Sequence, residues 1–283
     1  MAPNESVLFE EHVTAHGARI GIATLNAPQV LNSLSYEMVT LLAAQLNVWA
    51  ADAQIVMVIL RAAGDKAFCA GGDLHGLYAA ARSAPRGDPW AQTGARVFFE
   101  HEYRLDYQIH TYPKPLLCWG HGIVMGGGMG LMMGASHRVV TETSKLAMPE
   151  ISIGLFPDVG GSWILSRLPG RLGLFLALTG AQLGPADALY AALADVHVPN
   201  ARWPDVFKAI LDAQWETGHV NTDDAMLDQP ARGMNDATLT RILQSHAAPV
   251  EGDGPLARHT FLINNWCSGN DLEEICELIG LQA

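Results

Sequence analysis

Apolar residues in the first part of the chain follow strand and helix periods in turn. Short, mostly apolar stretches at residues 6–12 and 18–25 predict the two strands of a hairpin. After Ser35, a residue type that caps helices, the apolar residues of 36–52 share one face and predict an amphipathic helix. The continuous, β-branched run at 55–62 predicts a strand buried on both faces, so strand, helix and strand form a crossover unit. The residues expected on the buried helix face are Met38, Leu41, Leu42, Leu46 and Trp49.

The same alternation of strands and helices repeats further along the chain. The predicted elements are helices at 90–112 and 127–135 and strands at 115–124, 137–143 and 144–150. Residues 165–199 have a mostly helical pattern, and prolines then separate short helices, of which 270–279 is the last. The predicted fold class is α/β, with residues 1–200 forming the core domain and residues 201–283 a helical C-terminal section.

Composition and charge exclude several classes of protein. The chain has 283 residues, with 17 Lys and Arg against 29 Asp and Glu, and a net charge of −12. Because basic residues carry the affinity for nucleic acids, neither DNA nor RNA is an expected partner. The chain has no run of about eighteen apolar residues, and its N-terminus is acidic, so neither a membrane span nor a signal peptide is expected. We therefore expect a cytoplasmic protein.

Cysteine and histidine patterns indicate no metal site. The four cysteines lack C-x-x-C spacing, and none of the 11 histidines belongs to an H-E-x-x-H motif. We expect reduced thiols and no bound metal. His121, between two glycines, is expected to pack within a strand, with a place in a pocket wall as the alternative.

Two glycine-bearing turns are candidates for binding a ligand. Residues 68–74, FCAGGDL, follow a predicted strand, and residues 125–130, MGGGMG, join a strand to a helix. Glycine lets a ligand approach the backbone, and free N–H groups at a helix N-terminus favour a negatively charged oxygen. Two such groups converging on one oxygen would form an oxyanion hole, in which a single donor is worth about 3–4 kcal/mol. The alternative is that both clusters are only tight turns.

Two other glycine motifs are excluded by single residues. The dinucleotide fingerprint G-x-G-x-x-G fails because Met133 stands where its last glycine belongs. The serine-hydrolase motif G-x-S-x-G fails because Trp163 and Ile164 follow Ser162. Neither a nicotinamide cofactor nor a serine nucleophile is therefore indicated.

Carboxylates supply the candidate acid or base. Glu150 and Asp158 lie in the apolar stretch 147–161, where no neighbouring residue offers a salt bridge. If both face one pocket, burial and mutual repulsion should raise at least one pKa. The alternative is that they cap helix N-termini, which suits Asp158 before Gly160. Glu102 lies in a charged helical stretch, where an exposed side chain is the expectation.

Together these motifs resemble the crotonase (enoyl-CoA hydratase/isomerase) superfamily over residues 6–200, and most closely its 3-hydroxyisobutyryl-CoA hydrolases. The stretches that carry the resemblance are AFCAGGDL at 67–74, FFEHEY at 98–103, HGIVMGGGMGL at 121–131, AMPEISIGLFPDVGGSWILSRLPG at 147–170, LGLFLALTG at 172–180 and the tail at 264–279. Their order and spacing make the resemblance specific. It implies a crotonase-like spiral of ββα units.

The resemblance also implies an acyl-CoA thioester as substrate, so CoA is part of the substrate and no separate cofactor is expected. The N–H groups of Gly72 and Gly127 would bind the thioester carbonyl oxygen. Glu150 takes the position of the catalytic glutamate, and Asp158 takes that of an aspartate found in the hydrolases. The implied substrate-binding residues are Glu102, Ala70, Gly71 and Asp73.

Hydrolysis fits the resemblance better than hydration does. Hydratases carry a second glutamate just after the glycine triplet, where this chain has Gly130. We expect Glu150 to attack the thioester or to activate a water, giving CoA and 3-hydroxyisobutyrate in a step of valine breakdown. Enoyl-CoA hydration or isomerisation, and acyl-CoA binding without turnover, are the alternatives.

The end of the chain bears on the pocket. The hydrolases that it resembles continue beyond the equivalent of Ala283 into a helical segment that helps to close the acyl-CoA pocket. The pocket is therefore expected to be open or to be completed by a neighbouring subunit. We expect a homo-oligomer, in which trimeric packing, common in this superfamily, would cover apolar surface.

Overall fold

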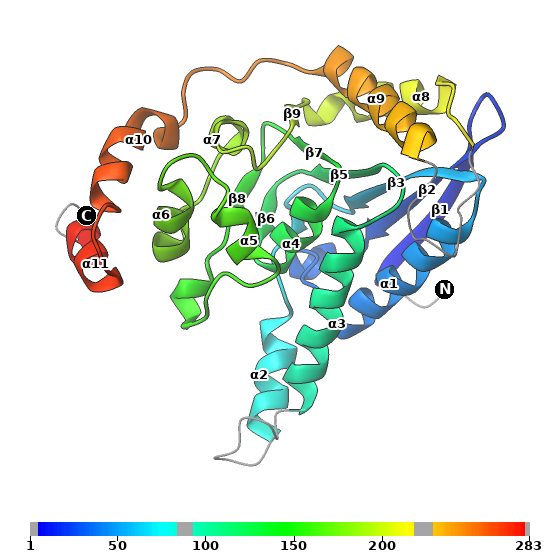
Figure 1. The fold of residues 1–283 in the computed structure, drawn as a ribbon. Helices are drawn as coiled ribbons and strands as arrows, with labels where there is room; N and C mark the ends of the chain where they lie inside the picture. The colour runs from blue at the N-terminus through cyan, green and yellow to red at the C-terminus, as the bar shows by residue number, and fades with distance from the viewer. Residues whose placement is uncertain (1–4, 84–92, 218–228, 281–283) are drawn as a thin grey trace.

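The computed structural model describes residues 5–83, 93–217 and 229–280 and contains two β-sheets flanked by helices (Figure 1). The strands are β1 (Val7–Val13), β2 (Arg19–Leu25), β3 (Ile55–Ala62), β4 (Ala67–Cys69), β5 (Leu116–Gly120), β6 (Ile123–Met125), β7 (His137–Val140), β8 (Lys145–Ala147) and β9 (Val196–His197). The α-helices are α1 (Tyr36–Ala51), α2 (Leu74–Ser83), α3 (Thr93–His110), α4 (Gly127–Gly134), α5 (Gly161–Leu165), α6 (Leu172–Thr179), α7 (Pro185–Tyr190), α8 (Trp203–Asp212), α9 (Gln229–His246), α10 (Pro255–Trp266) and α11 (Leu272–Gly280). Short 3-10 helices are η1 (Pro28–Val30), η3 (Glu150–Ile153) and η4 (Asn200–Arg202).

The chain adds strands to the two sheets alternately. The larger sheet has the order β1-β2-β3-β5-β7-β9, and the smaller has the order β4-β6-β8. Neighbouring strands are parallel except in the β1–β2 hairpin. The pairs β3 and β4, β5 and β6, and β7 and β8 each place one strand in each sheet before the chain enters a helix. This arrangement is a spiral of ββα units, and the predicted fold class is confirmed.

The first crossover unit forms as its hydrophobic pattern predicts. All residues of β3 except Arg61 are buried. Ser35 caps α1, because its hydroxyl accepts a hydrogen bond of 3.1 Å from the N–H of Met38. Leu41, expected on the buried face of α1, is exposed, because Val39 and Leu42 occupy that face on either side of it.

The predicted strand at 115–124 is in fact two strands in different sheets. The chain turns between β5 and β6 at Gly122, whose φ of +59° favours glycine. A Cβ at this position would lie 2.3 Å from the carbonyl oxygen of Lys66, so the close approach of that segment also requires glycine. His121 packs at this turn, where its Nε2 lies 2.9 Å from the carbonyl oxygen of Gly64.

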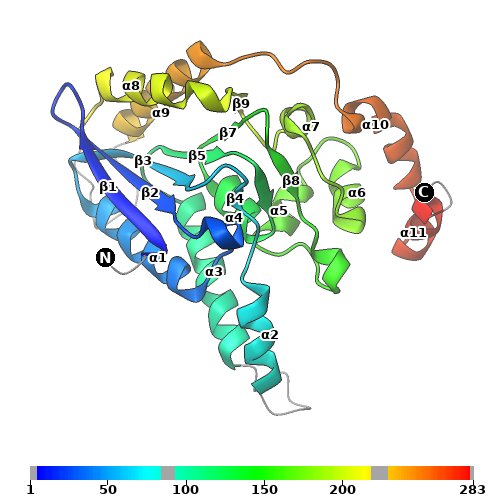
Figure 2. The same cartoon turned by 180° about the vertical axis from the view of Figure 1, so that it is seen from behind.

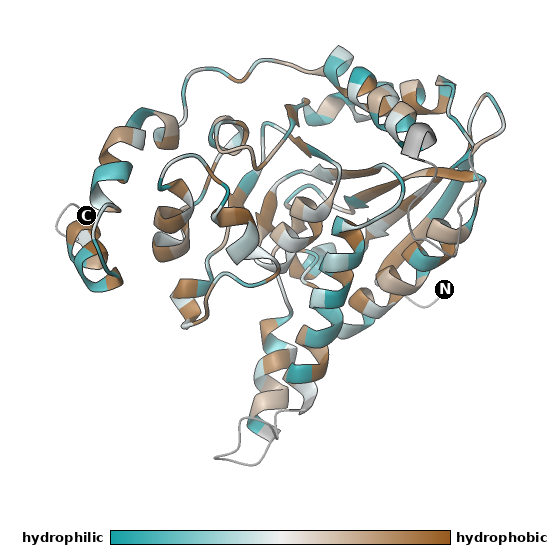
Figure 3. Cartoon of the chain, viewed as in Figure 1, coloured by the Kyte–Doolittle hydropathy of each residue, from teal (hydrophilic) through white to brown (hydrophobic). Residues whose placement is uncertain are grey.

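Helices cover both faces of the larger sheet. Apolar side chains of α1, α3 and α4 form one core with the strands, and those of α8 and α9 form a second core on the opposite face. The brown strands inside the layers of mixed-colour helices show this arrangement (Figure 3). The hairpin of α2 and α3 projects from the body in both views (Figures 1 and 2). Within the described residues, no helix combines the length and the apolar character needed to cross a membrane.

Helices of the C-terminal section contribute apolar side chains to both hydrophobic cores. Val206 and Leu239 belong to the core under α8 and α9, and Leu256 and Ile275 extend the other core through α10 and α11. The boundary near residue 200 between a core and a helical section stays a prediction.

Candidate active site

The two glycine turns meet at one end of the smaller sheet. The first follows β4 and the second follows β6, and because these strands are parallel neighbours, both turns lie at the same edge. Gly71 has a φ of +104°, and a Cβ there would lie 3.2 Å from the carbonyl oxygen of Met125 and 3.7 Å from the nitrogen of Gly127. Glycine at position 71 is therefore required both by its φ and by the second turn.

Each turn presents a backbone N–H with no partner. Among the described residues, the N–H groups of Gly72 and Gly127 donate no hydrogen bond. The backbone groups on either side of the Gly72 N–H are hydrogen-bonded. The N–H of Leu34 donates to the carbonyl of Gly71, and the carbonyl of Leu34 accepts from the N–H of Asp73. Gly127 is the first residue of α4, so the helix dipole adds to its N–H. Such an arrangement can bind a negatively charged oxygen.

A cavity of about 150 Å³ opens between these turns and the carboxylates. Its lining residues are Ala70, Gly71, Gly72, Leu74, Leu77, Phe98, Phe99, Glu102, Gly126, Gly127, Pro149, Glu150, Ser152, Ile153, Leu155, Asp158 and Val159. The structure thus brings together all of the predicted site residues except Asp73. The Asp73 carboxylate instead accepts hydrogen bonds of 3.1 Å from the N–H groups of His75 and Gly76 at the start of α2, and its contact with substrate stays a prediction.

Glu150 begins η3 and lines this cavity, and its carboxyl group interacts only with its own backbone N–H among the described residues. Its side chain is only 5% exposed, and Oε2 has no hydrogen-bond partner among the described residues. Oε1 lies 3.3 Å from the position of a Cβ on Gly126. Burial, with a smaller contribution from the charge of Asp158, raises the pKa of Glu150 to about 7. The carboxyl group is therefore suited to act as a base or a nucleophile near neutral pH.

Glu102 is buried, so the expectation of an exposed side chain is wrong. It is 2% exposed, and Oε1 lies 2.4 Å from where a Cβ on Gly127 would be. Burial first, and then the charges of Asp158 and Glu150, raise its pKa to about 8. The signal that could have identified it is helical spacing: Glu102 shares the buried face of α3 with Phe98, Leu105 and Ile109.

Asp158 does not cap a helix. α5 begins after Gly160 with no side-chain cap, and Asp158 Oδ2 instead accepts a hydrogen bond of 2.7 Å from the hydroxyl of Tyr103. The next residue, Val159, has a φ of +42°, which is rare for a β-branched residue. Strain of this kind is typical of functional sites, where the surroundings fix an unfavourable conformation. The sequence did not indicate Tyr103.

Asp106, one helical turn after Glu102, is a further buried carboxyl that the sequence reasoning missed. It is 8% exposed, and neither carboxyl oxygen has a partner among the described residues. Burial, then the charges of Glu102 and Asp158, raise its pKa well above the ordinary value. A Cβ on Gly130 would lie 2.7 Å from Oδ1, so Asp106 occupies space beside the glycine at that position.

Among the described residues, no lysine, arginine or histidine lines this cavity. Within the described part of the chain, no group of three or more His, Cys, Asp or Glu side chains is arranged to hold a metal ion. The cavity therefore offers backbone donors and carboxyl groups as its polar chemistry. This chemistry suits an uncharged carbonyl compound that develops negative charge on oxygen during reaction.

Comparison with known proteins places this geometry in a family. A family profile described as enoyl-CoA hydratase/isomerase matches residues 20–282. The mitochondrial 3-hydroxyisobutyryl-CoA hydrolase of Gallus gallus is 37% identical over 257 residues, which cover 91% of this chain and 61% of that protein. The chain thus spans about three fifths of the length of this curated relative.

Two solved structures share the fold over almost the whole chain. A carnitinyl-CoA dehydratase from Mycobacterium thermoresistibile has a TM-score of 0.79 at 36% identity, covering 99% of this chain and 71% of that one. An enoyl-CoA hydratase from Rhodobacter sphaeroides 2.4.1 has a TM-score of 0.73 at 32% identity, covering 97% of this chain and 73% of that one. The matched profile, the spiral of ββα units and the paired glycine turns agree, and the chain belongs to the enoyl-CoA hydratase/isomerase family.

Proposed function

We propose that the chain hydrolyses acyl-CoA thioesters and that 3-hydroxyisobutyryl-CoA is its substrate. The observation that carries this proposal is the meeting of two free N–H groups, on Gly72 and Gly127, with the unpartnered Oε2 of Glu150 in one cavity. The name of the chicken relative supports this substrate. A cavity of about 150 Å³ suits a short, branched acyl group.

In the proposed reaction, the thioester carbonyl oxygen lies between the N–H groups of Gly72 and Gly127. These donors and the N-terminus of α4 stabilise the negative charge that develops on this oxygen in the tetrahedral intermediate. Glu150 either attacks the carbonyl carbon or removes a proton from an attacking water. The C–S bond then breaks, its electron pair goes to sulfur, and the thiolate takes the proton that the water supplied, so CoA leaves as the thiol. Where Glu150 itself attacks, the acyl group first forms an anhydride with its carboxyl group, and water then cleaves this anhydride to the free acid and restores Glu150.

Glu102 and Asp158 would orient the 3-hydroxyl group of the substrate or the attacking water. With a pKa of about 8, Glu102 is mostly protonated at pH 7 and can donate a hydrogen bond. Asp158, fixed by the hydroxyl of Tyr103, keeps a second oxygen available as an acceptor. One donor and one acceptor are what a hydroxyl group or a water molecule needs to be held in a single orientation.

Hydration of an enoyl-CoA is the second candidate, and the enoyl-CoA hydratase that shares the fold at 32% identity favours it. Against it, the residue that follows the glycine triplet on α4 is Met129, and Gly130 comes next, so this turn of α4 provides no second carboxylate to hold a water. Acyl-CoA binding without turnover is the third candidate.

The test is release of free CoA from 3-hydroxyisobutyryl-CoA and from crotonyl-CoA, followed with a thiol reagent. We expect thiol from the first substrate, and loss of that activity by about 10²–10⁴-fold in Glu150→Gln with acyl-CoA binding retained. Glu251→Gln, at an exposed loop position, is the matched control and should match the wild type. Loss of the crotonyl-CoA double bond without thiol would support the hydratase, and tight binding without any product would support a binding protein.

Other expectations from the sequence stay predictions. They are the homo-oligomer with trimeric packing, the absence of a cofactor other than CoA in the substrate, the place of the reaction in valine breakdown and the cytoplasmic location. The chicken relative is named as a mitochondrial protein. The distribution of activity between subcellular fractions would decide the location.

A further inference from the structure

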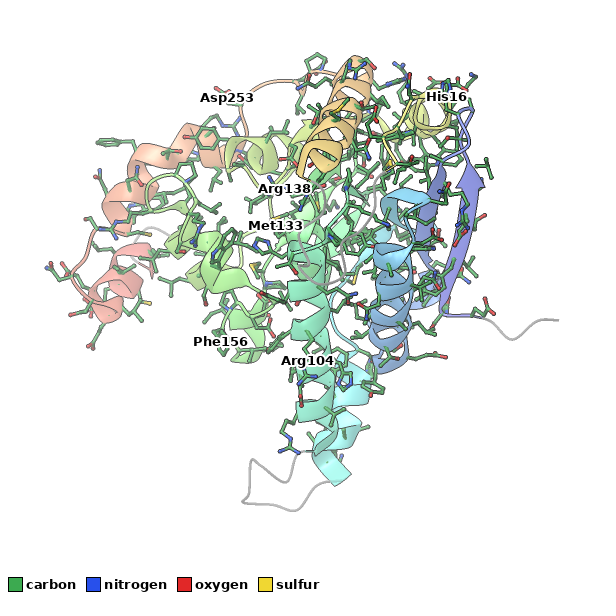
Figure 4. The ribbon with its side chains drawn as sticks, turned by 45° about the vertical axis from the view of Figure 1, so that its right-hand side comes forward. His16, Arg104, Met133, Arg138, Phe156 and Asp253 are labelled. Atoms are coloured by element: carbon green, nitrogen blue, oxygen red, sulfur yellow. The ribbon has the colours of Figure 1, made fainter. Side chains whose placement is uncertain are left out.

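A second cavity, of about 420 Å³, shares Val159 with the catalytic cavity. Its remaining lining residues are Tyr103, Asp106, Tyr107, His110, Gly130, Met133, Gly134, Gly160, Trp163 and Ile164. They come from α3, α4 and the start of α5, and Met133 of α4 is labelled in Figure 4. No step of the proposed hydrolysis uses this cavity. Its one carboxyl group is that of Asp106.

The carboxyl groups of Glu102 and Asp106 connect the two cavities along one face of α3. They are four residues apart, which places them on successive turns of the helix. Both lie against the glycine face of α4, with Glu102 beside Gly127 and Asp106 beside Gly130. Glu102 lines the first cavity and Asp106 lines the second. No hydrogen bond joins the two carboxyl groups, so a proton that passes between them needs a side-chain rotation or a bridging water.

The chemistry of hydrolysis supplies a proton that has to leave. Water and a thioester give a thiol and a carboxylic acid, and at neutral pH this acid ionises. Its O–H bond breaks, the electron pair stays on oxygen, and one proton per turnover leaves the catalytic cavity. Among the described residues, no lysine, arginine or histidine lines that cavity, so its carboxyl groups are the ionisable side chains there that can take the proton.

We propose that Asp106, acting through Glu102, carries this proton from the catalytic cavity to the second cavity. The inference rests on the proposed hydrolase function. The carboxyl oxygens of Asp106 have no hydrogen-bond partner in the described chain, so no fixed contact holds its proton in place. From the second cavity the proton reaches solvent past His110, an exposed residue of the same lining.

The charged and titratable groups around Asp106 are consistent with this role. They are Glu102, Tyr103, Tyr107 and His110 on α3 and Asp158 before α5, while Gly130 and Met133 of α4 bring no charge. Burial and the neighbouring carboxylates raise the pKa of both Glu102 and Asp106. Each group can therefore hold a proton near neutral pH, receive one and pass one on.

The test compares Asp106→Asn and Asp106→Ala with the wild type by CoA release from 3-hydroxyisobutyryl-CoA in dilute buffer. We expect kcat to fall by about 10-fold to 100-fold in both variants, with KM unchanged and a larger solvent deuterium isotope effect. Formate, which fits the space left in Asp106→Ala, should restore its kcat. Glu100→Gln is the control, because Glu100 pairs with Arg104 on the exposed side of α3 (Figure 4).

Three results would overturn the proposal. If the wild type is active and both variants keep its kcat, Asp106 carries no proton. If kcat falls but neither formate nor the isotope effect distinguishes the variants from the wild type, Asp106 has a structural role only. If the wild type itself releases no CoA, the hydrolase function fails, and the relay fails with it.

Discussion

Buried carboxyl groups in two regions of the molecule have opposite surroundings. At the junction of α7 and α10, the buried carboxylate of Asp187 accepts a hydrogen bond of 2.8 Å from the N–H of Leu256 and holds the two helices together. At the catalytic cavity and the adjoining second cavity, oxygens of Glu150 and Asp106 are also buried and have no partner among the described residues. Folded proteins satisfy almost all buried polar groups, but unpartnered atoms also occur at Thr14, His197 and Asp236, so the combination of missing partners with a cavity distinguishes this region.

Among the predictions that compare these two regions, the largest expected loss of activity comes from displacing the free N–H of Gly127 on α4. In Gly127→Ala, the new Cβ would lie 2.4 Å from Glu102 Oε1 and 3.0 Å from Leu34, so the donor must shift. We expect kcat for CoA release to fall by about 10²–10³-fold. Gly184→Ala is the control, because its Cβ would meet nothing within 4 Å. Equal activity in the two variants would contradict a catalytic role for this turn.

Asp187→Ala should have the opposite effect: it should lower the unfolding free energy and leave kcat unchanged. The N–H of Leu256 would be left buried and unsatisfied, which costs about 1–3 kcal/mol of unfolding free energy. Denaturant unfolding measures the loss, and kcat per folded molecule should equal that of the wild type. A fall in kcat without a fall in stability would remove the distinction between the two regions.

Glu102→Gln should stabilise the protein at high pH while it lowers activity. The folded-state pKa of Glu102 is raised from 4.5 to about 8, so the folded state binds more protons than the unfolded state between these values. Stability therefore falls as pH rises through this window. We expect the unfolding free energy of the variant to fall less steeply with pH and to exceed that of the wild type by at least about 1 kcal/mol at pH 8. Unfolding curves at pH 5 and pH 8 test this, and Glu100→Gln should leave the slope unchanged.

The smallest expected effects distinguish two tyrosines. The hydroxyl of Tyr103 donates to Asp158, and that of Tyr112 donates to the carbonyl of Leu46 within α1. Tyr103→Phe should lower kcat by less than about tenfold with little change in stability, and Tyr112→Phe should cost about 1 kcal/mol of stability with kcat unchanged. Kinetics and thermal unfolding of both variants check the pair. Identical profiles would contradict the separation.

The hydrophobic pattern predicted those elements whose own residues show a clear strand or helix pattern. The continuous apolar run of β3 and the capped, amphipathic α1 were predicted within about one residue. The break between β5 and β6 was missed, because residues on both sides are apolar and the carbonyl that demands Gly122 belongs to a distant segment. Helices α2 and α10 were missed although their apolar residues share one face, because both are short and α2 has a glycine in its first turn.

The candidate site was likewise predicted where residue type and order sufficed, and missed where long-range packing decides. Glycine turns and the carboxylates of Glu150 and Asp158 were identified from residue type and order, and the cavity contains them. The burial of Glu102 and Asp106 depends on the close packing of α3 against α4, which the sequence does not state. The contact of Tyr103 with Asp158 joins residues 55 positions apart, so only the folded chain reveals it.

The glycine at position 130 also limits how this scaffold can change its chemistry through evolution. A Cβ there would lie 2.7 Å from both Asp106 Oδ1 and the Cβ of Val159, so the space for a glutamate is already filled from two elements. A mutation to glutamate at position 130 would therefore clash unless both neighbours changed as well. A carboxylate at this position would therefore need coupled substitutions, because a single change to glutamate gives a poorly packed protein.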